Sequence, residues 1–167
     1  MHGRILVVDD EAIQRDIVKD ILEDQGYDVF TSGSGQDALE HIKTSPVDVI
    51  LTDLRMPGID GVELMESIKE SHPEIVVVVI TAYGSIESAV EAMKKGAYHY
   101  LTKPLDKEQL TLIVQRALQT KHLSDENRSL RRELQERYEF HNIIGRSRKM
   151  QEVFHRIRRN AFGRERD

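Results

Sequence analysis

Side chains that can bind a cation and a phosphoryl group follow or end four short apolar runs of the chain. They are Asp9, Asp10, Asp53, Thr81 and Lys103. Carboxylates that are crowded together repel one another, which favours a cation among them. A divalent ion such as Mg²⁺ takes oxygen ligands, often one or two carboxylates, and leaves room for a phosphate oxygen. A lysine ammonium and a threonine hydroxyl can contact the other phosphoryl oxygens, so these residue types predict a phosphoryl-transfer site.

The elements that must bring these residues together are predicted from the periodicity of apolar residues. Five short, β-branched runs predict strands, and they are Ile5–Val8, Val29–Thr31, Val47–Thr52, Ile75–Thr81 and Tyr98–Thr102. A segment with helical spacing follows each run, and this alternation predicts a doubly wound α/β domain with a five-stranded parallel sheet over residues 1–120. Folds of this type bind ligands outside the carboxyl ends of their strands, where the residues named above lie.

Four motifs, in this order, resemble the receiver domain of bacterial two-component response regulators. They are VVDDE at 7–11, LTDLRMPGIDG at 51–61, TAYGS at 81–85 and YLTKP at 100–104. The resemblance implies the flavodoxin-like strand order 2-1-3-4-5. It also implies that Asp53 accepts a phosphoryl group from a sensor histidine kinase, and that Thr81 and Lys103 contact this group.

The same resemblance implies the ligands of a Mg²⁺ ion and a switch residue. The implied ligands are Asp10, Asp53 and the backbone carbonyl of Arg55, with Asp9 acting through bound water. Tyr100 occupies the aromatic switch position of the family, and the Lys103–Pro104 bond is expected to be cis. We therefore expect phosphorylation to shift the chain between two surface states.

Simpler interpretations of these residues are also open. Asp9 and Asp10 can be helix N-caps, and Asp53 can be an exposed turn carboxylate before Met56–Pro57–Gly58. Lys103 can be a surface lysine, and Tyr100 can serve only for packing in an edge strand. Two other functions compete with the receiver: a Mg²⁺-dependent phosphatase with an aspartyl-phosphate intermediate, and a flavodoxin-like module that binds FMN.

Helical spacing continues beyond the receiver, over residues 107–140. Leu123, Asn127, Leu130 and Leu134 follow one another at the spacing of a coiled-coil seam. We expect a homodimer through this helix, with Asn127 fixing a parallel register; the alternative is a single solvated helix. Phosphorylation can tighten or loosen such a dimer, because both arrangements use the same residues.

Residues 141–167 resemble the opening of the AAA+ ATPase domain of NtrC-type activators, which act with the nitrogen-type sigma factor. Ser147 is the predicted N-cap of a helix with an apolar face, and this face comprises Met150, Val153, Phe154 and Ile157. The Walker A loop of that domain is absent before the chain ends. The chain is therefore expected to be the front piece of a longer regulator or a shortened one, to lack ATPase activity and to be no enzyme beyond its own phosphorylation and dephosphorylation.

Composition excludes several other classes of protein. The 167 residues include no Cys, which excludes a disulfide framework, a thiolate metal site and a thiol nucleophile. No apolar stretch reaches the roughly 18 residues that span a membrane, so we expect a cytoplasmic protein. Residues 1–119 carry 11 basic and 21 acidic side chains, and residues 120–167 carry 13 and 8. The basic residues of this second part alternate with Glu as on a solvated helix, so direct DNA binding is not expected.

Overall fold

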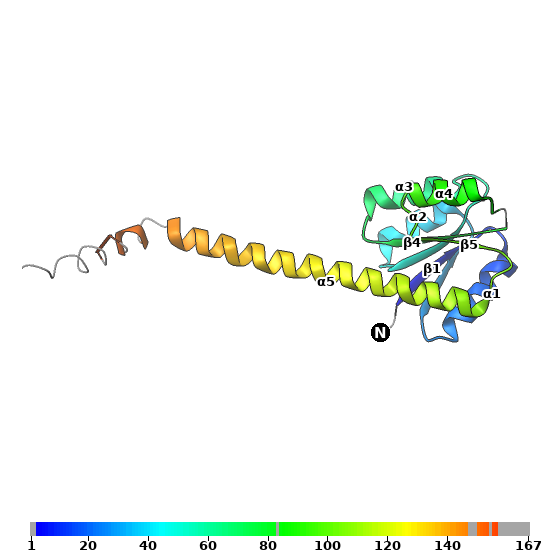
Figure 1. Cartoon of the computed structure of the whole chain (residues 1–167), viewed down its shortest axis with the longest axis horizontal. Coiled ribbons are helices and arrows are strands. Elements are labelled where there is room, and N and C mark those ends of the chain that lie inside the picture. Colours follow the sequence, from blue (N-terminus) through cyan, green and yellow to red (C-terminus); the bar gives the residue numbers. More distant parts are fainter. Residues whose placement is uncertain (1–2, 83, 147–149, 154, 157–167) are drawn as a thin grey trace, which may run out of the picture. The chain divides into compact units, whose positions relative to one another are not determined.

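Strands and helices alternate along the chain, as predicted (Figure 1). The computed structural model describes residues 3–82, 84–146, 150–153 and 155–156. Within these residues the elements are β1 (Arg4–Val8), α1 (Ala12–Glu23), β2 (Asp28–Ser32), α2 (Gly35–Thr44), β3 (Val49–Asp53), α3 (Gly61–Ser71), β4 (Val76–Thr81), α4 (Ile86–Lys94), β5 (His99–Thr102) and α5 (Lys107–Arg146).

The strands of the described residues form one parallel sheet of five strands in the order β2-β1-β3-β4-β5. The predicted fold class and strand order are confirmed. Every residue of β3 and β4 is buried, as expected for central strands that are covered on both faces. The edge strands β2 and β5 are partly exposed. Because all strands are parallel, their carboxyl ends lie at the same edge of the sheet.

Helices cover both faces of the sheet (Figure 1). α2, α3 and α4 pack on one face, and α3 contributes Leu64, Met65 and Ile68 to its core. α1 and α5 pack on the other face, where Leu22 of α1 and Leu110 of α5 are fully buried. Helix boundaries follow local signals: Asp60 forms a capping box with Glu63 at the start of α3.

α5 is longer than the other helices of the described residues and extends past the predicted end at residue 140. The chain divides into two units, residues 1–125 and 126–167, and the division falls within α5. In the predicted coiled-coil seam, Leu130 and Leu134 are 53% and 55% exposed in this single chain.

The predicted opening of the AAA+ domain is described only in part. Residues 141–146 continue α5, whereas Ser147, Phe154 and Ile157 lie outside the described residues. None of the described helices has a run of apolar residues long enough to traverse a lipid bilayer.

Candidate functional site

The carboxyl ends of four strands bring the predicted residues to one edge of the sheet. Asp53 ends β3 and Thr81 ends β4, whereas Asp9 directly follows β1 and Lys103 directly follows β5. The backbone N–H of Lys103 donates to the Thr81 carbonyl at 2.8 Å, which continues the pairing of β4 with β5 past the last residue of β5. Residues that lie far apart in the sequence are thus neighbours because parallel strands end together.

Lys103 joins two of the predicted carboxylates. Its Nζ atom donates to Oδ2 of Asp9 at 2.7 Å and to Oδ2 of Asp53 at 3.0 Å. The three side chains are 8–11% exposed. Burial by itself lowers the pKa of the Lys103 ammonium, but the hydrogen bonds and charges of Asp9 and Asp53 outweigh burial, so this pKa is raised. Lys103 therefore provides a buried positive charge beside Asp9 and Asp53 and is not an ordinary surface lysine.

Asp9, Asp10 and Asp53 form an acidic cluster that can hold a metal ion. Each offers a carboxylate oxygen, and these oxygens lie within 4.8 Å of one another. Asp9 and Asp53 are buried and Asp10 is exposed, so the cluster is open to solvent on one side. Converging oxygen donors of this kind suit Mg²⁺.

The first two of these aspartates are not the N-cap of α1. That position belongs to Glu11, whose side chain makes no capping hydrogen bond. Oδ1 of Asp9 instead accepts from the Glu11 N–H at 2.9 Å, and the Arg15 guanidinium donates to the Asp9 carbonyl. The simpler interpretation of Asp9 and Asp10 as caps does not describe this structure.

Backbone packing after β3 holds Asp53 in place. Its Oδ1 atom accepts from the backbone N–H of Arg55 at 3.2 Å. A Cβ atom on Gly61 would lie 2.1 Å from the Asp53 carbonyl oxygen, so only glycine lets the start of α3 approach the end of β3 this closely. Gly58 has a φ of +81°, as the predicted turn requires. Asp53 is 8% exposed, so it is not an exposed turn carboxylate.

Tyr100 contacts Ser88, a residue that no sequence pattern identified as part of the site. Its half-buried ring packs against the core beneath α2, α3 and α4, and a hydrogen bond of 2.9 Å joins its hydroxyl to Oγ of Ser88. Ser88 belongs to the first turn of α4, where it forms a capping box with Ser85. Tyr100 therefore connects β5 with the start of α4. Thr81 is fully buried, and the Lys103–Pro104 peptide is cis as expected.

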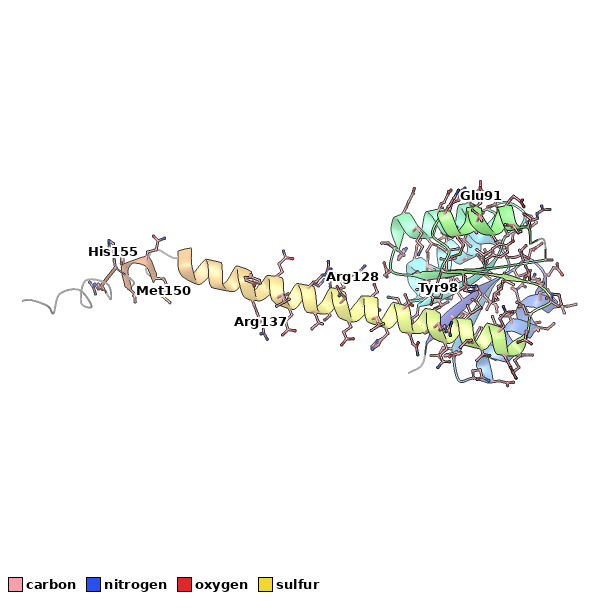
Figure 2. All side chains as sticks on the ribbon, in the orientation of Figure 1. Glu91, Tyr98, Arg128, Arg137, Met150 and His155 are labelled. Atoms are coloured by element: carbon pink, nitrogen blue, oxygen red, sulfur yellow. The ribbon has the colours of Figure 1, made fainter. Side chains whose placement is uncertain are left out.

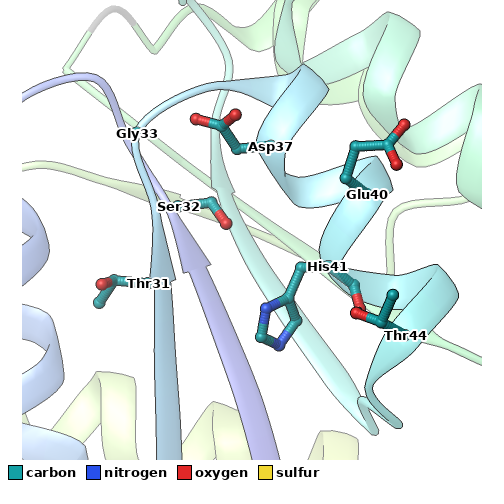
Figure 3. A pocket seen from close by; sticks show the side chains of 7 residues that line it. All are labelled: Thr31, Ser32, Gly33, Asp37, Glu40, His41 and Thr44. Atoms are coloured by element: carbon teal, nitrogen blue, oxygen red, sulfur yellow. The ribbon is translucent and has the colours of Figure 1, made fainter.

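A separate hollow of about 500 Å³ lies beside β2 and α2 (Figure 3). The carboxylates of Asp37 and Glu40 point away from the imidazole of His41 there. His41 instead contacts the ring of Phe30 at a centroid distance of 5.0 Å. These side chains do not converge on a shared ligand position, so the acidic cluster around Asp53 is the candidate site.

Comparison with known proteins assigns the family. The model of the response regulator receiver domain matches residues 5–115. The chain therefore belongs to the response regulator receiver domain family.

Particular relatives narrow this assignment and confirm the resemblance to NtrC-type regulators. The chain is 40% identical over 155 residues to the nitrogen assimilation regulatory protein NtrX of Azorhizobium caulinodans, a match that covers 92% of this chain and 33% of NtrX. It is 35% identical over 158 residues to the DNA-binding transcriptional regulator NtrC of Escherichia coli, covering 95% of this chain and 33% of NtrC. The chain thus spans about a third of the length of these relatives.

A solved receiver structure agrees with the fold. The solution structure of the beryllofluoride-activated NtrC4 receiver domain dimer superposes with a TM-score of 0.68 at 42% sequence identity, covering 71% of this chain and 98% of that receiver.

Proposed function

We propose that this chain is a phosphorylation-controlled switch that accepts a phosphoryl group from a sensor histidine kinase on Asp53. The contact of Asp53 Oδ2 with Lys103 Nζ, beside two further carboxylates, carries this proposal. It puts an acceptor oxygen, a cation and a candidate metal site together at one edge of the sheet.

Asp53 supplies the nucleophile of the proposed reaction. One of its carboxylate oxygens attacks the phosphorus atom of the donor phosphohistidine, and the P–N bond to that histidine breaks. Lys103, already within hydrogen-bond distance of Asp53, contacts an oxygen of the transferred group, and the Thr81 hydroxyl donates to another. The product is an acyl phosphate on Asp53.

The acidic cluster fits a Mg²⁺ ion. Asp10, Asp53 and the Arg55 carbonyl would hold it, and this ion, when bound, would offset negative charge on the transferring oxygens. Both carboxylate oxygens of Asp9 already accept hydrogen bonds, from Glu11 and from Lys103. Asp53 is held in the same way, by Arg55 and Lys103, so these contacts do not distinguish the two carboxylates. By the resemblance to receivers, Asp9 would act through bound water.

The switch would act through Tyr100. When the Thr81 hydroxyl moves toward the phosphoryl group, space opens beside the Tyr100 ring. Rotation of the ring into that space would break its hydrogen bond to Ser88 and so release the first turn of α4 from β5. The surface formed by α4 and β5 would change as a result.

We further propose that α5 connects this switch to a homodimer and to a downstream AAA+ domain. The exposed Leu130 and Leu134 and the exposed Asn127 between Leu123 and Leu130 support a dimeric coiled coil over residues 107–140. By likeness to NtrX and NtrC, the whole regulator would control transcription. The domain boundaries that go with this proposal are 1–120 for the receiver and 141–167 for the opening of the AAA+ domain.

Incubation with the small donor phosphoramidate tests the proposal. We expect one phosphoryl group per chain in Mg²⁺, none after chelation of divalent ions and none in Asp53→Asn. Rapid release of phosphate from a phosphomonoester such as p-nitrophenyl phosphate would instead indicate a phosphatase. A bound flavin, detected by its absorbance, would contradict the receiver assignment.

A further inference from the structure

Lys69 is a half-buried cation at the edge of the sheet opposite Asp53. It lies in the last turn of α3, and its Nζ donates to the carbonyl of Ile75, just before β4, at 3.0 Å. The ion pairs of the described residues do not include Lys69. By contrast, the ammonium of Lys95 contacts the carboxylates of Glu66 and Glu91.

Packing holds the stem of Lys69 in one place. A Cβ atom added to Gly96 would lie 3.5 Å from Cε of Lys69, so the methylenes lie against the glycine backbone. The amine is thereby presented next to the Ile75 carbonyl. An amine that keeps one N–H···O bond to a carbonyl still has a lone pair for reaction once it is neutral.

A hollow of about 380 Å³ opens at this amine. Polar side chains contribute to its lining, namely Lys69, Glu74, Tyr98, Thr120, Lys121 and Ser124. Tyr98, labelled in Figure 2, accepts a hydrogen bond of 3.4 Å from Thr120. Two bonds of 2.7 Å tie the Lys121 ammonium to Asp125. An ammonium has three N–H donors, so Lys121 has one more for a small anion.

Burial also makes the Lys69 amine more reactive. Burial lowers the pKa of Lys69 below its usual value, and the charge of Glu74 partly opposes this. A larger fraction of this amine is therefore neutral near pH 7 than of an exposed lysine, and only the neutral amine is a nucleophile.

We propose that Lys69 is a site of Nε-acylation by small acyl phosphates that enter this hollow. The neutral amine attacks the carbonyl carbon of the donor, and an N–C bond forms. The C–O bond to phosphate breaks, and phosphate leaves with the electron pair. The amine loses its extra proton to solvent or to the Glu74 carboxylate, so the product is an amide and inorganic phosphate. This reaction is independent of the phosphorylation of Asp53.

Site-resolved mass spectrometry of the folded chain with acetyl phosphate tests this proposal. Asp53→Asn is used as the background, so that phosphorylation cannot affect the result. We expect Lys69 to be acetylated about fivefold faster than the exposed Lys94 at neutral pH. The ratio should narrow as pH rises, because Lys69 becomes fully neutral and loses the advantage that its lowered pKa gives near pH 7. In urea the preference should disappear.

A matched pair of charge variants tests whether Lys69 reacts faster because its amine is more often neutral or only because it is accessible. Glu74→Gln removes the carboxylate that opposes deprotonation, so the Lys69 rate should rise roughly threefold while the Lys94 rate stays the same. Glu70→Gln removes an equal charge from an exposed neighbour in α3 and should leave the Lys69 rate unchanged. Lys69→Arg should abolish the modification at this position.

A second acetyl donor tests whether the preference for Lys69 is specific to acyl phosphates. Acetyl coenzyme A carries the same acetyl group as a thioester and has no phosphate on the acyl carbon for Lys121 to contact, so we expect it to show a smaller preference for Lys69 than acetyl phosphate does. Equal rates for Lys69 and Lys94 with acetyl phosphate, or a ratio that does not change with pH, would overturn the proposal. An equal preference with both donors would overturn the role of the hollow.

Discussion

Replacement of Lys103 by Met tests whether its ammonium balances the acidic cluster. Methionine keeps much of the side-chain volume but leaves Asp9 and Asp53 without their shared cation. Removing one partner from a buried ion pair costs about 3–5 kcal/mol in the free energy of unfolding. The three side chains are 8–11% exposed and lie at an edge of the sheet, so water reaches them and we expect a loss of about 2 kcal/mol.

Urea unfolding with and without Mg²⁺ measures this effect. For a slope of about 2 kcal/mol per molar urea, the midpoint of Lys103→Met should fall by about 1 M when no divalent ion is present. Mg²⁺ binds only where the carboxylates converge, in the folded state, so it should stabilise the variant more than the wild type. In the wild type the ammonium already offsets part of the same negative charge.

Lys95→Met is the matched control, because the Lys95 ammonium also contacts two carboxylates, those of Glu66 and Glu91, but at the surface. This control should unfold at the wild-type midpoint and gain no extra stability from Mg²⁺. An unchanged midpoint for Lys103→Met without Mg²⁺, or equal gains from Mg²⁺ in variant and wild type, would refute the reasoning.

Three other residues give shorter tests. Burial raises the pKa of Asp48, but the hydrogen bonds and charge of Arg4 outweigh burial, so this pKa is lowered. The pairing of Asp48 with Arg4 therefore stabilises the fold fully above the unfolded pKa of about 4, and this stabilisation is lost as pH falls through the lowered pKa of the folded state. Asp48→Asn should therefore cost about 1 kcal/mol at pH 7, a figure reduced because Arg4 is 40% exposed. The difference in urea midpoint from the wild type should shrink as pH falls through the lowered pKa of Asp48, and a difference that stays constant would contradict this. Ser88→Ala removes a capping hydroxyl and the partner of Tyr100, so we expect a loss of about 1 kcal/mol in urea unfolding, and no loss would mean that neither contact matters. Asn127→Leu should change the oligomeric state in sedimentation, and a monomer both before and after the change would end the coiled-coil proposal.

Much of the candidate site follows from strand pattern alone. Asp9, Asp53 and Lys103 each stand at the end of an apolar run, and parallel strands must end at one edge, so their convergence needs no knowledge of distant contacts. Their separate roles come only from the resemblance to receivers. Ser88 was missed because its contact with Tyr100 depends on how α4 packs against β5, which no local pattern records.

The sequence also does not predict the charge contacts at the edge of the sheet opposite Asp53. Arg4 and Asp48 are joined by hydrogen bonds of 2.9–3.1 Å across 44 residues of sequence, and either could have been an ordinary surface charge. The sequence predicts that α5 is a helix but not how far it extends. The absence of Gly and Pro predicts a continuous helix to residue 140, whereas the helix continues through Gly145 to Arg146.

Locating the phosphoryl group on the chain tests the central claim most directly. After incubation with phosphoramidate and Mg²⁺, tandem mass spectrometry of the digested chain should place one phosphoryl group on the peptide that contains Asp53, at the Asp53 side chain. Modification of a different residue, or of Asp53 to the same extent after all divalent ions have been removed, would contradict the account.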